Sequence, residues 1–363
     1  MKSRPIGLIF RNEAFRDHEQ VVFCSDRDAG LNAIIAIHDT TLGPGLGGTR
    51  VWPYPSEAAA LRDCLRLSEG MTYKNALAGL ALGGAKAVII ADPEDGKTHA
   101  LLEAYGRHVE RLGGSFITGE DVGTSVGDMD IVATRTAHVR GTSKSPIGDP
   151  SPFTAYGVLK GIEAALGHRL GRATLAGVRV SLQGLGHVGM ALAGLLHQRG
   201  ADLSVADIRD DVVARARDRF GARVVETEAA HAQEVDVFAP CALGAGLNAR
   251  TIPEIRAEIV AGSANNQLET SADGRLLSSR GILYAPDYVI NAGGVIAIAG
   301  DSPDTTPQSC RIEIDRIART LGEIFARAEQ DGEATSLVAD RMAEERIAAA
   351  RKSRFNGGSG AAD

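Results

Sequence analysis

Val178-Arg-Val-Ser-Leu-Gln-Gly184-Leu-Gly186-His-Val-Gly189 carries the most specific fold signal in the chain. Its first half predicts a strand, its second half has the spacing G-x-G-x-x-G, and Met190–Gln198 continues with helical periodicity. Gly184 permits a tight turn, Gly186 lets the backbone approach a pyrophosphate, and Gly189 lets helix and strand pack closely. Because the helix N-terminus offers N–H donors to phosphates, the stretch predicts a Rossmann-type dinucleotide site.

A carboxylate follows where such a site requires one. Asp207 ends the next predicted strand, Leu203–Ala206, 23 positions after Gly184. A carboxylate about 20 residues beyond the glycines accepts the ribose hydroxyls and repels a 2′-phosphate, which favours NAD over NADP. Arg209 leaves some use of NADP open, because an arginine there accommodates a 2′-phosphate. The remaining predicted cofactor contacts in the loop and after Asp207 are Leu185, His187, Val188, Met190 and Ile208. We expect His187 to be a solvated loop side chain and not a general base, because the loop faces pyrophosphate.

Length and composition indicate a soluble two-domain protein. The chain has 363 residues, of which 44% are hydrophobic and 23% charged, and domains usually contain roughly 100–200 residues. The net charge of −7 includes no basic block, so we expect a small-molecule ligand and no nucleic acid or membrane partner. Without a signal peptide or an apolar run of roughly 20 residues, the predicted location is cytoplasmic. Four scattered cysteines predict neither a metal site nor disulfides.

The order of predicted elements gives an α/β fold with two different sheets. Residues 1–145 begin with an apparent hairpin and read as an N-terminal α/β domain with a mixed sheet. Arg140–Pro152, rich in Gly, Ser and Pro, is the linker candidate, and residues 146–332 alternate strand and helix as a doubly wound parallel sheet does. Two closing helices are expected, at Cys310–Asp331 and Ser336–Arg351, before a flexible tail at 352–363.

The N-terminal half contains three candidate proton-handling or anion-binding residues. Lys74 and Lys86 lie near glycine-rich turns in apolar surroundings, and desolvation lowers the pKa of a lysine toward the range of a useful base. Asp121 lies in a glycine-bracketed turn after a strand, where open α/β sheets place functional side chains. From spacing alone, surface lysines and a turn aspartate explain these residues equally well or better. The glycine-rich loop at 42–50 likewise fits either a ligand-binding or a structural turn.

In combination, these segments resemble the glutamate, leucine, phenylalanine and valine dehydrogenase family, and its leucine and valine branch most closely. The resemblance runs from about Glu19 to Arg351. Its ordered motifs are GPGLGGTR (43–50), GMTYKNA (70–76), GLALGGAKAVI (79–89), TGEDVGT (118–124), GDPSPFTAYGV (148–158), the glycine fingerprint, DVFAPCALG (236–244), GSANNQL (262–268) and YAPDYVINAGGVI (284–296).

The resemblance implies a role for each candidate residue. Lys74 aligns with the lysine that binds the substrate α-carboxylate, Lys86 with the base that activates water, and Asp121 with the acid/base that serves the amino group. The reaction is reversible oxidation of an L-amino acid to a 2-keto acid and ammonia, with NAD as hydride acceptor. The resemblance adds Thr154, Cys241, Ala242 and Asn265 to the cofactor site and Asn266 and Asn291 to the substrate side of the cleft.

The implied substrate pocket is aliphatic, with Leu46, Gly47, Gly119, Val295 and Ile298 as its lining. Glutamate-specific relatives place a lysine and a hydroxyl where this chain has Leu46 and Ile298, and burial of a substrate carboxylate without such partners costs several kcal/mol. We therefore expect Leu, Val or Ile as substrate. Phenylalanine is the alternative, because Gly119 stands where the leucine enzymes usually have alanine.

The same resemblance implies a C-terminal helix, 333–351, that returns to the first domain, closure of a cleft between the domains, and a homo-oligomer between a dimer and an octamer. Two residues depart from the branch: Ala81 replaces the usual aspartate and Ala85 the usual third glycine before Lys86. A non-catalytic NAD-binding regulator is therefore the alternative from a different functional class, although the proton-handling residues are intact.

Overall fold

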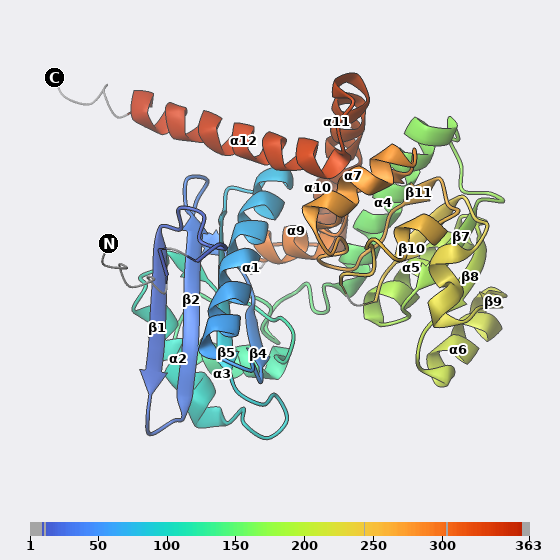
Figure 1. Ribbon diagram of the computed structural model, residues 1–363. Helices are drawn as coiled ribbons and strands as arrows, with labels where there is room; N and C mark the ends of the chain where they lie inside the picture. Colours follow the sequence, from blue (N-terminus) through green and yellow to red (C-terminus); the bar gives the residue numbers. More distant parts are fainter. Residues whose placement is uncertain (1–8, 11, 243, 303, 358–363) are drawn as a thin grey trace, which may run out of the picture. The chain divides into compact units, whose positions relative to one another are not determined.

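A computed structural model describes residues 9–10, 12–242, 244–302 and 304–357. The chain divides into two compact units (Figure 1). Unit 1 contains Met1–Gly148, Asp301–Pro303 and Glu344–Asp363, and unit 2 contains Asp149–Gly300 and Asp304–Ala343. The division after Gly148 falls within the stretch expected to be a linker, three residues beyond the expected end of the first domain.

Unit 1 is built on a mixed six-stranded sheet with the order β1-β2-β5-β3-β6, in which β4 also pairs with β5. The first two pairings, β1 with β2 and β2 with β5, are antiparallel, and the others are parallel. The strands are β1 (Gln20–Asp26), β2 (Leu31–Asp39), β3 (Gly45–Leu46), β4 (Thr49–Trp52), β5 (Gly83–Ile90) and β6 (Phe116–Ile117). The mixed sheet predicted for the N-terminal domain is confirmed.

Helices cover both faces of this sheet, and strand alternation sorts the side chains between them. The helices are α1 (Glu57–Leu77), α2 (His99–Glu110) and α3 (Val126–Ala133). Ile34, Ala36 and Val88 pack with α1, whereas Ile35 and Ile89 pack with α2 and α3. Ser56 caps α1 by accepting the N–H of Ala59, as its sequence position before an apolar helical pattern predicts. Lys86 alternates in phase with Val88, so its side chain belongs to the α1 face.

Unit 2 is built on an all-parallel sheet with the order β12-β11-β10-β7-β8-β9. Counted from β7, this is the strand order 3-2-1-4-5-6 of the Rossmann fold, and the two halves meet where β7 lies beside β10. The strands are β7 (Arg179–Gln183), β8 (Asp202–Ala206), β9 (Arg223–Val224), β10 (Val237–Pro240), β11 (Ile259–Val260) and β12 (Leu283–Tyr284). The doubly wound C-terminal domain is confirmed as well.

The helices of unit 2 lie on both faces of its sheet. α4 (Ser151–Leu170), α5 (His187–Gln198) and α6 (Asp210–Phe220) pack on one face. The connections on the other face are η1 (Thr227–Ala232), η2 (Ile252–Glu254) and α7 (Ser271–Ser279), which enclose an apolar core around Phe238 and Ile252. The remaining helices are α8 (Asp287–Ile290), α9 (Gly293–Ala299), α10 (Pro307–Ile314), α11 (Arg316–Asp331) and α12 (Thr335–Gly357).

The C-terminal helices differ from the sequence prediction in three ways. The single helix expected at Cys310–Asp331 is two helices, because the chain breaks at Asp315 between α10 and α11. α12 continues through 352–357, which were expected to be flexible; Arg351 pairs with Asp39 of unit 1 at 2.7 Å and anchors this end. The helix belongs to unit 2 up to Ala343 and to unit 1 from Glu344. The rest of the predicted tail, 358–363, lies outside the described residues.

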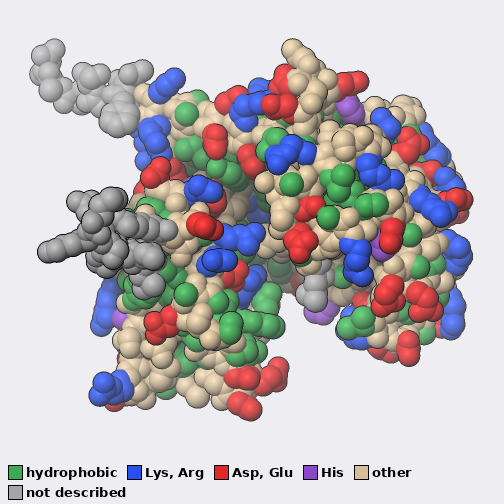
Figure 2. All heavy atoms as spheres, in the orientation of Figure 1, with side chains coloured by type: hydrophobic (Ala, Val, Ile, Leu, Met, Phe, Trp, Pro, Cys, Tyr) green, Lys and Arg blue, Asp and Glu red, His purple; other side chains and the backbone are tan. Residues whose placement is uncertain are grey.

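Charged side chains of both signs are interspersed over the face drawn in Figure 2. Within the described ranges, no helix is both long and apolar enough to cross a membrane. The same part of the chain holds no group of three or more His, Cys, Asp or Glu residues arranged to bind a metal ion.

Candidate active site

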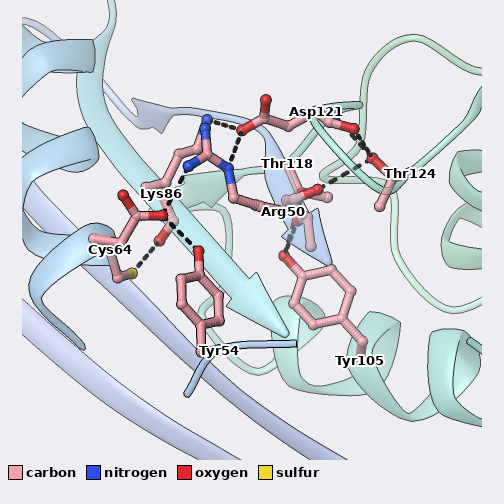
Figure 3. Close-up of polar contacts among 10 residues, drawn as sticks. Arg50, Tyr54, Cys64, Lys86, Tyr105, Thr118, Asp121 and Thr124 are labelled. Carbon is pink, nitrogen blue, oxygen red and sulfur yellow. Dashed lines mark hydrogen bonds and ion pairs between the residues drawn. The ribbon is translucent and has the colours of Figure 1, made fainter. Parts of the chain in front are cut away.

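Lys86 and Asp121 form an ion pair in unit 1 (Figure 3). Lys86 lies in the middle of β5, where its backbone pairs with Ala36 of β2. Asp121 follows β6 in the turn that the glycines bracket. Only 8% of the Lys86 side chain and 18% of the Asp121 side chain are exposed, so the two charges meet in a largely water-free setting.

The pKa of Asp121 lies below its ordinary value. Burial alone would raise this pKa, but the positive charges of Lys86 and Arg50 outweigh the effect of burial. The hydrogen bond from the N–H of Val122 lowers the pKa further. Asp121 is therefore a carboxylate at neutral pH, with a cation on each of two neighbouring elements.

Arg50 of β4 is the second cation, and it faces the same carboxylate oxygen as Lys86. Its Nε lies 3.8 Å from Asp121 Oδ2, while its Nη1 donates to Asp63 Oδ2 at 2.8 Å. Asp63, on α1, also accepts the Tyr54 hydroxyl at 2.5 Å. Burial alone would lower the pKa of Arg50, but the charges of Asp121 and Asp63 raise it. Two carboxylates and two cations thus alternate across β4, β5, α1 and the Asp121 turn.

Hydroxyl groups fix the turn that carries Asp121. Thr124 Oγ1 accepts the Asp121 N–H at 2.8 Å and lies 3.1 Å from the carbonyl oxygen of Thr49. The side-chain oxygen of Thr49 is in turn hydrogen-bonded to Thr118 at 2.6 Å and to Tyr105 at 2.5 Å, all three being buried. Because each hydroxyl has a partner, this buried network restricts the turn to one arrangement.

The glycine-rich loop before Arg50 packs between β5 and this turn. A Cβ at Gly47 would lie 1.6 Å from the carbonyl oxygen of Ala85, and one at Gly48 would lie 2.9 Å from the Cβ of Asp121. No side chain fits at either distance, so close packing alone requires glycine here. The contact of Gly47 with substrate stays a prediction.

The other predicted substrate residues of unit 1 lie on elements next to the ion pair. Lys74 is in the last turn of α1, the helix that covers the face to which Lys86 belongs. Leu46 is buried in β3, where its carbonyl oxygen accepts the Asn75 amide at 3.4 Å. A Cβ at Gly119 would meet only the carbonyl oxygen of Arg140, at 3.7 Å, which is an ordinary contact. Space for a side chain therefore exists at Gly119.

The fingerprint of unit 2 has the geometry of a nucleotide loop. Gly184 has φ +99°, and a Cβ there would lie 2.7 Å from Ala242 N; a Cβ at Gly189 would lie 2.0 Å from Gly184 O. Gly186, in contrast, has no atom within 4 Å of the position that a Cβ would occupy. It is the N-cap of α5. None of the described side chains caps this helix, so its first N–H groups stay available to an anion.

Asp207 lies against the same loop. Its Oδ2 accepts the N–H of Leu185 at 2.6 Å, and its Oδ1 accepts the N–H and Nε of Arg209 at 3.0 and 3.3 Å. Burial would raise the pKa of Asp207, but the hydrogen bonds from Leu185 and Arg209 lower it. Ile208, which follows Asp207, is 88% exposed. His187 begins α5 with a highly exposed side chain.

Several of the remaining predicted residues of unit 2 form two groups. Asn291 is buried and donates to Ser263 O at 3.1 Å and to Asn265 Oδ1 at 2.8 Å. The second group surrounds α9: a Cβ at Gly294 would lie 2.5 Å from Thr154 Oγ1. Val295 and Ile298 are half-buried and lie one turn apart on α9. The other predicted residues lie outside these two groups: Asn266 has φ 51°, burial raises the thiol pKa of Cys241, and Val188 and Met190 are on α5.

Comparison with known proteins identifies the family. Residues 18–138 match the model described as "Glu/Leu/Phe/Val dehydrogenase, dimerisation domain", and residues 205–352 match "Glutamate/Leucine/Phenylalanine/Valine dehydrogenase". The chain belongs to the Glu/Leu/Phe/Val dehydrogenase family. The resemblance found in the sequence is thereby confirmed, and the protein is an amino-acid dehydrogenase.

Several family members are similar over almost their whole length. The leucine dehydrogenase of Bacillus cereus is 51% identical over 340 residues, which cover 93% of each chain. The valine dehydrogenase of Streptomyces coelicolor is 48% identical, covering 92% of this chain and 93% of its own. The crystal structure of L-tryptophan dehydrogenase from Nostoc punctiforme is 46% identical and superimposes with a TM-score of 0.81, covering 92% of this chain and 97% of that one.

Sequence reasoning missed the Arg50, Asp63 and Tyr54 part of this Glu/Leu/Phe/Val dehydrogenase site. Arg50 closes the motif GPGLGGTR, but an arginine after a loop gives no signal by itself. Asp63 lies within α1, 13 positions from Arg50, and only the fold brings its carboxylate to the guanidinium. A charged residue at a half-buried helix position was the one available hint.

Proposed function

We propose that this chain catalyses the reversible, NAD-dependent oxidative deamination of a branched-chain L-amino acid to its 2-keto acid and ammonia. The observation that carries the proposal is the desolvated Lys86–Asp121 ion pair, which places a base for water next to a carboxylate that can relay its proton. The leucine and valine dehydrogenases at 48–51% identity support the choice of substrate class.

In the proposed mechanism, Lys74 binds the substrate α-carboxylate as a point charge. Bound NAD would supply the acceptor for the hydride of Cα, and loss of that hydride would turn the substrate amine into an iminium ion. Lys86, in its neutral form, takes a proton from water as the water oxygen bonds to the iminium carbon. The Asp121 carboxylate accepts that proton from Lys86 and passes it to the amino group before ammonia departs, and Lys86 takes the hydroxyl proton as the carbonyl forms. The closeness of Lys86 to Asp121 supports this division, because a proton can pass between the two groups without bulk water.

For the cofactor, the residues present fit a dinucleotide. The open space at Gly186 and the N–H groups at the start of α5 suit a pyrophosphate, and Asp207 stands at the end of β8 to accept ribose hydroxyls. The partial positive charge of a helix N-terminus favours the phosphates further. NAD is preferred to NADP, since a 2′-phosphate would approach the carboxylate of Asp207.

For the substrate side chain, the predicted contact residues are Leu46, Gly119, Val295 and Ile298. All are apolar or lack a side chain, which disfavours glutamate. Phenylalanine remains the second candidate, supported by the space at Gly119 and by the 46% identity to an L-tryptophan dehydrogenase. Ala85 is fully buried in β5, so its methyl group adds to the core without adding a charge near Lys86.

We further propose that the chain works as a homo-oligomer. The matched description of residues 18–138 as a dimerisation domain supports this, as does a glutamate dehydrogenase of Thermus thermophilus that is a hetero-hexamer and is 25% identical. Light scattering measures the subunit number. The cytoplasmic location stays a prediction.

The test is an assay of purified protein with NAD and a panel of L-amino acids at alkaline pH, followed by NADH absorbance. Leucine, valine and isoleucine should give the highest kcat/KM, phenylalanine a lower value, and glutamate none. No signal with any amino acid, together with measurable NAD binding, would instead identify a non-catalytic regulator.

A further inference from the structure

Asp121 faces two cations of different chemistry. Lys86 gains and loses a proton in the proposed mechanism, whereas the guanidinium of Arg50 stays charged at every pH at which proteins are folded. When Lys86 becomes neutral to act as a base, Asp121 loses one counter-charge. A desolvated carboxylate left without a cation is strongly unfavourable, so the site needs another positive charge at that moment.

Arg50 is placed to supply that charge. Its Nε is buried and donates to no acceptor among the described residues, although it lies 3.8 Å from Asp121 Oδ2 (Figure 3). This separation is beyond a hydrogen bond, and a movement of less than 1 Å by the carboxylate would close it. In the structure, Lys86 pairs with the Asp121 carboxylate, and the Nε–H of Arg50 is close to that carboxylate but does not yet donate to it.

Asp63 binds the Arg50 guanidinium through Nη1, whereas Asp121 lies near its Nε. The guanidinium is thereby fixed, and the Asp121 carboxylate is the group that moves. Asp63 Oδ2 accepts Arg50 Nη1 at 2.8 Å and the Tyr54 hydroxyl at 2.5 Å. The Arg50 side chain is 22% exposed and that of Asp63 29%, so solvent screens their attraction only partly. Asp63 on α1 and Tyr54 after β4 therefore fix the distance between Arg50 and the catalytic pair.

We propose that Arg50 is a positioning residue that provides Asp121 with a permanent counter-charge while Lys86 is neutral. The proposal rests on the functions proposed above for Lys86 and Asp121. As Lys86 gives its proton to solvent, the Asp121 carboxylate shifts toward Arg50 Nε. When Lys86 takes a proton from the attacking water, it becomes cationic again and regains Asp121. One proton leaves and one returns, and Arg50 exchanges none.

The decisive variant is Arg50→Gln, which keeps a hydrogen-bonding side chain and removes the charge. Without Arg50, Asp121 retains the protonated form of Lys86 more strongly, so the alkaline pH needed for full kcat should rise. We expect kcat to fall at least about tenfold at pH 8 and less than about threefold at pH 10.5, with KM for NAD unchanged. Arg50→Lys, which restores a positive charge, should regain most of the wild-type pH profile.

A structural role for Arg50 gives different results. A loss of kcat by the same factor at both pH values, or equal pH profiles for Arg50→Lys and Arg50→Gln, would overturn the proposal, as would no loss at all. Arg107→Gln is the matched control, because Arg107 pairs with Asp26 at the surface of the same unit and should leave the profile unchanged. If circular dichroism shows that Arg50→Gln does not fold, Arg50→Met, which preserves the apolar stem, replaces it.

Failure of this inference is distinguishable from failure of the proposed function. An inactive wild-type protein contradicts the function itself. Active wild type with near-normal Lys86→Ala or Asp121→Asn contradicts the assigned catalytic pair. If both variants lose turnover and the pH profile of kcat in Arg50→Gln is unshifted, only the proposed role of Arg50 is refuted.

Discussion

The Lys86 ammonium and the Asp121 carboxylate meet from separate elements, the middle of β5 and the turn after β6, and less than one-fifth of each side chain is exposed. In such a setting the attraction between two charges is several times stronger than in water. The position of either group therefore depends on the other, and a change at one should alter both proton transfer and local stability.

Replacement of Lys86 by alanine should lower kcat by about 10²–10⁴-fold, because the general base is lost. NAD affinity, measured by fluorescence titration, should be unchanged, since the predicted nucleotide contacts lie on unit 2. Lys97→Ala is the matched control: Lys97 is also a largely buried lysine of unit 1, paired with Asp128 at 2.7 Å. That variant should lose thermal stability but much less kcat. Near-normal kcat in Lys86→Ala contradicts its assignment as the base.

Addition of a methyl group at Gly119 should change substrate preference without unfolding the protein. The new Cβ in Gly119→Ala would meet only Arg140 O, at 3.7 Å, so the fold tolerates it. If Gly119 lines the pocket, the ratio of kcat/KM for phenylalanine to that for leucine should fall about tenfold, within the usual 1–3 kcal/mol for one methylene.

Gly47→Ala provides the contrasting result for Gly119→Ala. Its Cβ would lie 1.6 Å from the carbonyl oxygen of Ala85, so the variant should be strongly destabilised or insoluble. An unchanged phenylalanine-to-leucine ratio in folded Gly119→Ala would remove Gly119 from the predicted pocket.

The sequence predicted the fold well where local pattern and packing agree. The strand at Val178–Gln183, the glycine turn and the following helix all occur with at most a few residues' difference at the boundaries. Apolar periodicity also predicted the helix capped by Ser56. It did not predict the break at Asp315, because the apolar pattern continues across that residue.

The candidate site was less accessible to sequence reasoning. Spacing gave Lys86 and Asp121 no advantage over surface residues, because their pairing joins positions 35 apart through the sheet. Their suggested roles came from family resemblance. Arg50 and Asp63 were missed altogether, since a half-buried ion pair between a strand and a helix leaves no periodic signal.

Acidification should destabilise unit 1 through His18. Burial lowers the pKa of His18 to about 4 from 6.5, and the nearby His38 lowers it further, although the hydrogen bond between His18 Nε2 and Leu65 O, 3.1 Å apart, opposes the shift. The folded-state pKa is the lower one, so the unfolded chain binds this proton first as the pH falls. The free energy of unfolding should therefore be highest above about pH 6.5 and decrease by up to about 3 kcal/mol towards pH 4.

The measurement is the thermal midpoint of wild type, His18→Gln and His99→Gln between pH 7.5 and about 4. His18→Gln should show a shallower decrease than wild type, and His99→Gln, at an exposed position, the wild-type decrease. Some decrease should remain in His18→Gln, because burial also lowers the pKa of His38, whose ring centroid lies 4.8 Å from that of His18. Parallel curves for wild type and His18→Gln would exclude His18 as the source.

Removal of the charge at Asp207 should relax the preference for NAD. In the structure the Asp207 carboxylate accepts hydrogen bonds from the Leu185 N–H and from Arg209 Nε. Arg209, the side chain suited to a 2′-phosphate, is therefore paired with Asp207, whose charge repels a 2′-phosphate. Asp207→Asn keeps an oxygen for Leu185 and frees Arg209. The ratio of kcat/KM for NADP to that for NAD should rise about 10–100-fold, as the loss of a charged hydrogen bond to ribose implies. In the double variant Asp207→Asn/Arg209→Ala this gain should largely disappear. If the double variant uses NADP as well as Asp207→Asn does, Arg209 does not bind the phosphate, and the preference for NAD depends on the carboxylate alone.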